Sequence, residues 1–154
     1  MSFAEYLSTL DQFKPAFMDG YRGLVPPTEI ANRLKSLQTH RMIAVLSGGH
    51  CPDCHDFVPV FARLAELTAD LDVRIFPRDE HPVLAKRFAT NEKHYIPTAV
   101  IMDGQFQELG RFVERPQLLK DIITSGEDPL RRDRRGAYQM ATAEEIINFL
   151  FHSL

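Results

Sequence analysis

The segment 47–55, Ser-Gly-Gly-His-Cys-Pro-Asp-Cys-His, constrains the fold more strongly than any other part of this chain. It contains the protein's two cysteines, Cys51 and Cys54, separated by two residues. The apolar run 42–46 precedes the segment, and apolar residues at helical spacing follow it from Pro52 onward. This pattern predicts that a buried strand ends and a helix begins at the cysteine pair.

A cysteine at the start of a helix lies beside unpaired backbone N–H groups and the positive end of the helix dipole. Both favour the thiolate, which is the nucleophilic form of cysteine. Pro52 suits the first helical turn because its missing N–H is not needed there. The spacing leaves Cys51 exposed at the helix tip and Cys54 one step further inside, within reach for a reducible disulfide. We therefore predict a redox-active dithiol in which Cys51 attacks and Cys54 resolves.

The length, charge and termini of the chain narrow the functional classes. With 154 residues, 44% hydrophobic and 25% charged, one globular domain is expected, with a core that needs no disulfides. A net charge of -3 gives no reason to expect nucleic acid or an anionic membrane as partner. No window is apolar enough to span a bilayer, and the first residues lack the basic and apolar regions of a secretory signal. We therefore expect a cytoplasmic protein, in which a CxxC pair is more often catalytic or metal-binding than structural.

The N-terminal part of the chain is expected to be helical. Residues 2–5 have the spacing of a capping box, and the apolar residues that follow predict a helix over 3–13. Pro15 then interrupts the helical pattern. A loop over 20–27 comes next, and Thr28 is expected to cap a second helix.

Beyond the cysteines, strand and helix patterns alternate. Apolar positions keep helical spacing from Phe57 to Leu71, and Pro59 is expected to kink that helix. The remaining expected elements are a buried strand over 73–76, a short helix opened by His81-Pro82, a strand over 97–102, a hairpin turn at Asp103-Gly104, a returning strand over 106–113, and a helix over 117–124 whose Leu118, Leu119, Ile122 and Ile123 face the sheet.

The C-terminal part combines a polar segment with an apolar helix. Residues 128–136 include four arginines and indicate a solvated linker, with an anion-binding patch as the alternative. Thr142 and Glu145 predict a capping box that starts a last helix reaching Leu154. Because that helix carries many large apolar groups, we expect it to pack on its own domain, against the N-terminal helix, or else on a second copy.

This order of elements is an α/β pattern with a mixed sheet. Along it occur, in this order, the Cys51-Pro-Asp-Cys54 motif, Pro59 five residues after the second cysteine, the Asp79-Glu-His-Pro82 segment, Ile96-Pro97-Thr98 and the Asp103-Gly104 hairpin. In these features and their order the chain resembles the thioredoxin superfamily over about residues 36–124.

The resemblance implies a single domain over 1–154 with a thioredoxin-like fold, in which helices flank a central mixed β-sheet. Helical residues 1–35 and a linker with a helix over 125–154 would extend this core. It also implies a cis Ile96–Pro97 bond, which would place the Ile96 backbone beside the dithiol to pair with an extended client chain. The implied activity is that of a protein-disulfide reductase that needs no bound cofactor.

Two positions next to the cysteines depart from the usual thioredoxin sequence. His50 stands where thioredoxins carry a tryptophan, and the Pro52-Asp53 dipeptide resembles thioredoxin-related proteins with a Trp-Cys-Pro-Asp-Cys site. A protonated His50 would favour the Cys51 thiolate, whereas the Asp53 carboxylate would oppose it. We therefore expect His50, Pro52 and Asp53 to modulate the dithiol.

A third departure concerns the resolving thiol. Val45 replaces the buried acid that thioredoxins carry six residues before the first cysteine. Cys54 would then resolve slowly, or pass its proton to water or to a nearby histidine. His50 and His55 are expected at the mouth of the site, either for such a role or simply as exposed polar residues.

Together these patterns predict a cytoplasmic thiol-disulfide oxidoreductase that reduces client proteins or small disulfides. Its own electrons would come from a reductase or a low-molecular-weight thiol, and the protein would be a monomer or a weak homodimer. One alternative is a zinc or copper module that uses residues 50–55, although a structural zinc site needs four ligands and the sequence has no second ligand pair. The other is a redox-inert docking protein on the same scaffold.

Overall fold

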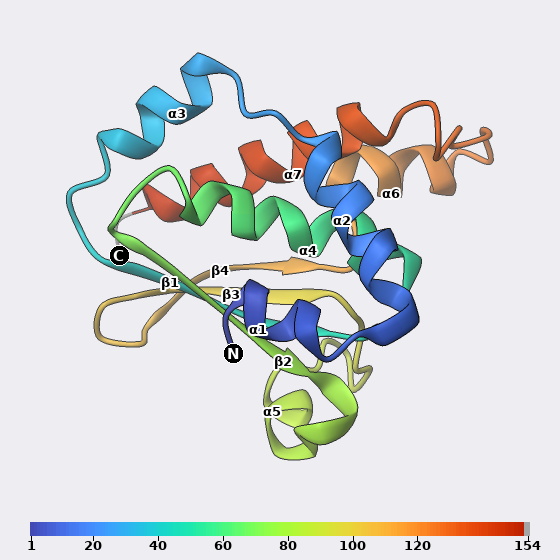
Figure 1. Cartoon of the computed structure of the whole chain (residues 1–154), viewed down its shortest axis with the longest axis horizontal. Helices are drawn as coiled ribbons and strands as arrows, with labels where there is room; N and C mark the ends of the chain where they lie inside the picture. The colour runs from blue at the N-terminus through green and yellow to red at the C-terminus, as the bar shows by residue number, and fades with distance from the viewer. Residues whose placement is uncertain (153–154) are drawn as a thin grey trace.

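The computed structural model describes residues 1–152 of the chain. Within this part, four strands form a sheet in the order β2-β1-β3-β4 (Figure 1). The strands are β1 (Arg41–Ser47), β2 (Leu71–Pro77), β3 (Thr98–Asp103) and β4 (Glu108–Val113). β1 pairs in parallel with β2 and antiparallel with β3, and β4 is antiparallel to β3. The sheet is therefore mixed, as the sequence predicts.

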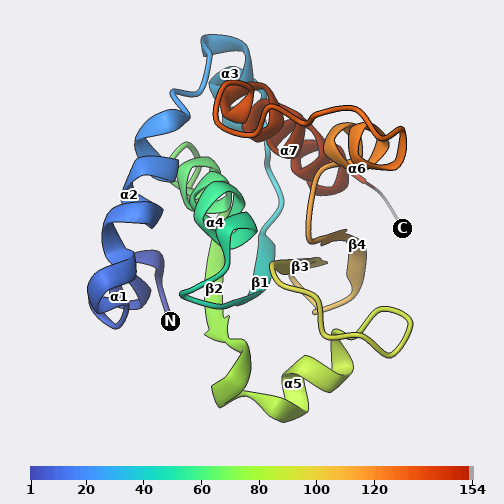
Figure 2. The ribbon, with the colours of Figure 1, turned by 90° about the vertical axis from the view of Figure 1, so that its right-hand side faces the viewer.

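Helices cover the two sides of this sheet unequally. They are α1 (Phe3–Ser8), α2 (Lys14–Gly23), α3 (Thr28–Lys35), α4 (Pro52–Ala65), α5 (Pro82–Arg87), α6 (Gln117–Thr124) and α7 (Arg135–Leu150). Figure 2 shows α4 and α7 over one face of the sheet, α2 on the outer side of α4, and α5 on the opposite side of the sheet. The cysteine segment lies between β1 and α4, at the end of a central strand.

The strand that leads to the cysteines is buried on both faces. Ile43 and Val45 point to one face and Ala44 and Leu46 to the other, and all four are buried. An unbroken apolar run is what such a strand requires. Burial on both sides holds the end of β1, and therefore the start of α4, in a fixed position.

The main core lies between the sheet, α4 and α7. Phe112 of β4 meets the rings of Phe57 and Phe61 edge-on, with ring centroids 6.0 and 5.6 Å apart. On the same strand, a Cβ at Gly110 would collide with the ring of Phe149 in α7. Glycine at this position therefore lets α7 lie close against β4.

The N-terminal helix predicted over 3–13 is wrong in its extent. The capping box at residues 2–5 forms, but α1 ends at Ser8, and a 3₁₀ turn over Asp11–Phe13 leads into α2. Pro15 lies in the first turn of α2, where a missing N–H costs nothing, instead of interrupting a helix. Gly20 lies in α2 and not in a loop. A Cβ at this position would collide with the backbone oxygen of His55, so glycine allows α2 to pack closely on α4.

Several other boundaries differ by a few residues. α3 begins at Thr28 itself, with Pro27 as the N-cap residue. α4 ends at Ala65, so Leu71 belongs to β2 and not to the helix. The returning strand begins at Glu108 and not at residue 106, so four residues separate β3 from β4. The Asp103 carboxylate holds this longer turn by accepting the backbone N–H groups of Gln105 and Gln107.

The C-terminal helix starts earlier than predicted. α7 begins at Arg135, and Thr142 lies inside it with its hydroxyl donating to the carbonyl oxygen of Tyr138 at 2.9 Å. The Glu145 carboxylate instead accepts the backbone N–H of Gln117 at the start of α6. The predicted capping box is therefore wrong, and the predicted end of the helix at Leu154 lies outside the described residues.

α7 packs on its own chain, but against α4 and the sheet more than against α1. In α6, Leu119 is buried whereas Leu118 and Ile123 are exposed, so only part of its predicted apolar face meets the fold. Within residues 1–152, none of the helices combines the length and apolar character that crossing a bilayer requires.

Candidate active site

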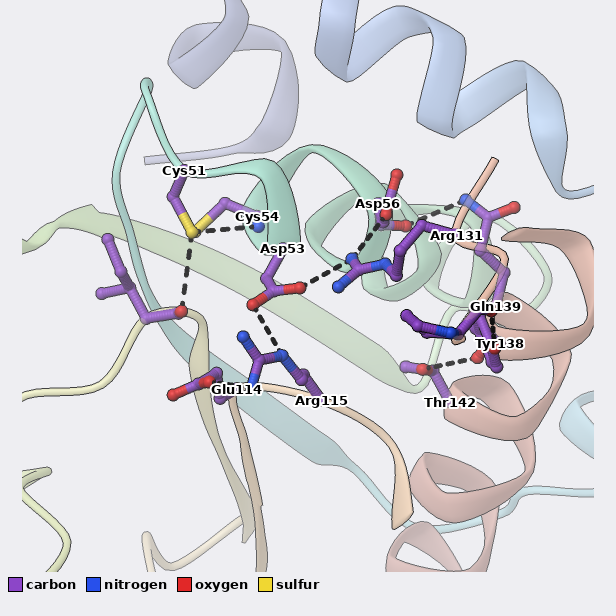
Figure 3. Close-up of polar contacts among 12 residues, drawn as sticks. Cys51, Asp53, Cys54, Asp56, Glu114, Arg115, Arg131, Tyr138, Gln139 and Thr142 are labelled. Carbon is purple, nitrogen blue, oxygen red and sulfur yellow. Dashed lines mark hydrogen bonds and ion pairs between the residues drawn. The ribbon is translucent and has the colours of Figure 1, made fainter. Parts of the chain in front are cut away.

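The two cysteines lie at the start of α4 and are both free thiols (Figure 3). Cys51 is the N-cap residue, and its Sγ accepts the backbone N–H of Cys54 at 3.4 Å. Cys51 is partly exposed, whereas Cys54 is fully buried. The sequence prediction of an outer and an inner thiol therefore matches the geometry of the helix start.

The two thiols have opposite pKa shifts. The pKa of Cys51 is lowered to about 7, above all because the Cys54 thiol donates a hydrogen bond to its sulfur, against the opposing effects of burial and of the Asp53 charge. The pKa of Cys54 is raised well above its ordinary value, first by burial and then by its contacts with Cys51. Near neutral pH, Cys51 therefore carries the thiolate and Cys54 keeps its proton.

Ile96 and Pro97 lie beside the outer sulfur. The Ile96–Pro97 bond is cis, as the resemblance implies, and the carbonyl oxygen of Ile96 lies 3.6 Å from the Cys51 sulfur. The Ile96 side chain also fills the space that a Cβ would need at Gly48. The fold thus brings together the dithiol and the segment that was singled out from the sequence as a client-binding site.

The two histidines have different surroundings. His50 is exposed next to Cys51. His55 is half-buried, with its Nε2 atom 2.6 Å from the carbonyl oxygen of Gly49 and its ring edge-on to Phe17 of α2. The alternative in which His55 is simply an exposed polar residue is therefore wrong, because α2 covers its ring.

Asp53, between the cysteines, points away from them and is only 8% exposed (Figure 3). Its carboxylate forms ion pairs with Arg115, at 3.0 Å from Nε, and with Arg131, at 2.7 Å from Nη2. Arg131 also pairs with Asp56, one helical turn further along α4, at 2.9 Å. Two cations from distant parts of the chain therefore surround the charge that opposes the Cys51 thiolate.

Neither arginine was expected from the sequence to be a site residue. The segment 128–136 was expected to be a solvated linker, and for Arg131 this is wrong because its guanidinium is half-buried against α4. The alternative expectation, an anion-binding patch, is closer, since the anions are the chain's own Asp53 and Asp56. The cluster of arginines was the available signal, but nothing local indicated which acids it would meet.

α7 holds this arginine segment in place. The Tyr138 hydroxyl donates to the carbonyl oxygen of Pro129, just before Arg131. The buried Gln139 amide donates to the backbone oxygens of Gly20 and Asp56, at 2.8 and 2.9 Å, and so connects α2, α4 and α7. The C-terminal residues therefore pack into the structure around the cysteine segment.

The alternative of a metal-binding module has no assembled set of ligands in residues 1–152. In this part of the chain, no group of three or more His, Cys, Asp or Glu side chains is arranged so that it could hold a metal ion. His55, one of the expected ligands, uses its Nε2 atom for the contact with Gly49.

Comparison with known proteins gives a family and a fold. No curated protein matches the sequence. Two solved structures are similar to this one over 97% of the chain. One is a Pseudomonas aeruginosa protein of unknown function, with 23% sequence identity, 90% of its own chain covered and a TM-score of 0.82. The other is an HIV epitope scaffold, with 22% sequence identity, 91% of its own chain covered and a TM-score of 0.79. At these identities the similarities show the fold alone.

A family model described as thioredoxin matches residues 1–129, which include the cysteine segment, the cis-proline segment and all four strands. The match and the mixed sheet with its flanking helices confirm the thioredoxin-like α/β fold that the sequence predicts. This chain therefore belongs to the thioredoxin family.

Proposed function

We propose that this protein is a thiol-disulfide oxidoreductase that reduces disulfides in client proteins or small molecules through Cys51 and Cys54. The observation that carries the proposal is the pairing of a partly exposed Cys51, whose pKa is about 7, with a buried, protonated Cys54 at the same helix start. One thiol is prepared to attack and the other is within reach to resolve.

The first step is attack of the Cys51 thiolate on one sulfur of a client disulfide. A bond forms between Cys51 and that sulfur, the client's sulfur–sulfur bond breaks, and the second client sulfur leaves as a thiolate that takes a proton from water. Because the pKa of Cys51 is lowered to about 7, more of the protein carries the nucleophile at neutral pH than an ordinary cysteine would allow.

The second step is attack by Cys54 on the mixed disulfide. Cys54 loses its proton, the Cys51–Cys54 disulfide forms, and the remaining client sulfur leaves and is protonated. The client gains two electrons and two protons, and the protein's dithiol loses the same. A reductase or a low-molecular-weight thiol would return the pair to the reduced state.

The client would lie in extended form along Ile96 and Pro97. The Ile96 carbonyl oxygen already faces the Cys51 sulfur at 3.6 Å, so a client backbone next to this segment would place its disulfide near the thiolate. The proposed location is the cytoplasm, where the glutathione and thioredoxin systems keep thiol pairs reduced.

Reduction of insulin by dithiothreitol tests the proposal. The wild-type protein should accelerate precipitation of the insulin B chain, whereas the Cys51→Ser variant should stay at the rate of dithiothreitol alone. Arg132→Ala, which alters an exposed side chain, serves as a control for mutation as such. A wild-type rate no faster than that of dithiothreitol would favour the alternative of a redox-inert docking protein.

A further inference from the structure

The buried position of Cys54 raises the question of what stabilises its sulfur when it attacks. Cys54 is fully buried, and its raised pKa makes the thiolate costly to form. Val45, on the preceding strand, is apolar and offers no carboxylate. His55 is turned toward Gly49 and α2.

Two buried hydroxyl groups lie on this side of the inner thiol. Tyr6 of α1 and Ser47 at the end of β1 share a hydrogen bond of 2.8 Å, and both residues are almost completely buried. The Ser47 hydroxyl lies close enough to Cys54 to lower its pKa, as does the backbone N–H of Gly48. Tyr6 and Ser47 therefore form a buried pair of hydroxyl groups beside Cys54, inside an apolar core.

Either hydroxyl of the Tyr6–Ser47 pair can donate to the other. Burial raises the pKa of Tyr6 far above its ordinary value, so its hydroxyl keeps its proton at any pH at which the protein works. A protonated tyrosine can donate to the oxygen of Ser47, and this leaves the one hydroxyl hydrogen of the serine free to point at sulfur.

We propose that Ser47 donates a hydrogen bond to the Cys54 sulfur as negative charge develops on it, and that Tyr6 is the positioning residue that orients Ser47 for this task. The proposal rests on the dithiol cycle described under the proposed function and concerns only its second step. A neutral donor stabilises a developing anion in a dry site without itself taking up a proton.

The Cys54 sulfur forms its bond to Cys51, the bond from Cys51 to the client sulfur breaks, and the client sulfur leaves with the electron pair. The proton released by Cys54 passes to the leaving client thiolate or, where that thiolate is weakly basic, as an aromatic one is, to water. Ser47 and Tyr6 keep their own protons throughout.

The experiment separates the two steps with one equivalent of an aromatic disulfide, dithionitrobenzoate, mixed with the reduced protein in a stopped-flow instrument. Attack by Cys51 releases the first coloured thiolate, and resolution by Cys54 releases the second. The variants are Tyr6→Phe and Ser47→Ala, with Tyr21→Phe as a matched control that removes a tyrosine hydroxyl bonded to Glu66, on the outer side of α4. Ser47→Thr keeps a hydroxyl and serves as the conservative rescue.

The proposal expects the first phase to stay within twofold of wild type in every variant. The second phase should slow by about 3- to 10-fold in Tyr6→Phe and Ser47→Ala, which is the effect of one hydrogen bond, and should be normal in Tyr21→Phe. Its pH profile should also move to higher pH, because losing a donor raises the pKa of Cys54 further. The charges that reach Tyr6 itself are those of Cys51, Cys54 and Glu80.

Equal second-phase rates and pH profiles in wild type, Tyr6→Phe and Ser47→Ala would overturn this inference and leave the proposed function intact. A wild-type protein that releases no second thiolate would instead contradict the dithiol cycle itself. Thermal melting of each variant identifies effects that arise from unfolding, since unfolding would also raise the pH midpoint of the first phase to that of an ordinary cysteine.

Discussion

The Nη2 atom of Arg131 lies 2.7 Å from the Oδ1 atom of Asp53, although 78 positions separate the two residues in the sequence. Asp53 is the residue whose negative charge opposes the Cys51 thiolate. Together with Arg115, Arg131 compensates this charge and orients the carboxylate away from the sulfurs. The C-terminal segment therefore holds the carboxylate whose charge raises the pKa of Cys51.

Replacing Asp53 should lower the pKa of Cys51 below about 7. Asp53→Asn removes the negative charge and leaves two arginines uncompensated, and both changes favour the thiolate. The pH dependence of the rate of iodoacetamide alkylation measures this pKa. Asp133→Asn, at an exposed position in the arginine segment, should leave the midpoint unchanged. A midpoint that rises in Asp53→Asn would show that the carboxylate acts on Cys51 in some other way than by its charge.

Replacing Arg131 should shift the pKa of Cys51 in the opposite direction and weaken the fold. Arg131→Ala leaves Asp53 and Asp56 less compensated, so the alkylation midpoint should rise. The loss of a partly buried ion-pair network should also cost about 1–2 kcal/mol of unfolding free energy, between the values for exposed and buried ion pairs, measured by denaturant titration. The neighbouring exposed Arg132→Ala should change neither quantity. Equal effects of the two replacements would mean that only the general positive charge of the segment matters.

The wild-type alkylation rate should depend on pH through Cys51 alone. The thiolate reacts and the thiol does not, so the rate should be low below the pKa, rise as pH increases through about 7 and then level off. Cys54 should stay unmodified over this range, because burial and a raised pKa both protect it. Mass spectrometry of the labelled peptides distinguishes the two cysteines. Modification of Cys54 at the same midpoint would contradict the assignment of the two thiols.

α7 should contribute to stability through its buried face. Ile146 lies on the buried face of α7 and is fully buried. Ile146→Ala should therefore cost about 2–4 kcal/mol of unfolding free energy in a denaturant titration. The same replacement at Ile123 of α6, which is 41% exposed, should cost about 0.5 kcal/mol or less. Similar losses at both positions would mean that α7 does not pack in solution as it does in the structure.

The fold around the dithiol could be predicted because its signals are local. An apolar run that predicts a doubly buried strand, followed by helical spacing from Pro52, places the cysteines at a strand-to-helix junction without any knowledge of distant residues. The segment around Ile96 and Pro97 was recognisable for the same reason, since three consecutive residues carried the resemblance.

The rest of the site could not be predicted because it depends on long-range contacts. Nothing near Tyr6 indicates that its hydroxyl meets Ser47, and nothing near Arg131 indicates that it meets Asp53. Thr142 and Glu145 show the opposite error. Their spacing is that of a helix start, but tertiary packing extends α7 through them and gives each side chain another hydrogen-bond partner.

The central claim, that Cys51 attacks and Cys54 resolves, is tested most directly by trapping mixed disulfides. Cys54→Ser and Cys51→Ser proteins, each incubated with cell extract, are compared on non-reducing gels, with the double serine variant as the background. The account predicts that Cys54→Ser collects disulfide-linked partners, because attack by Cys51 proceeds but resolution does not, and that Cys51→Ser collects no more than the background. More partners on Cys51→Ser than on Cys54→Ser would reverse the roles of the two sulfurs and contradict the account.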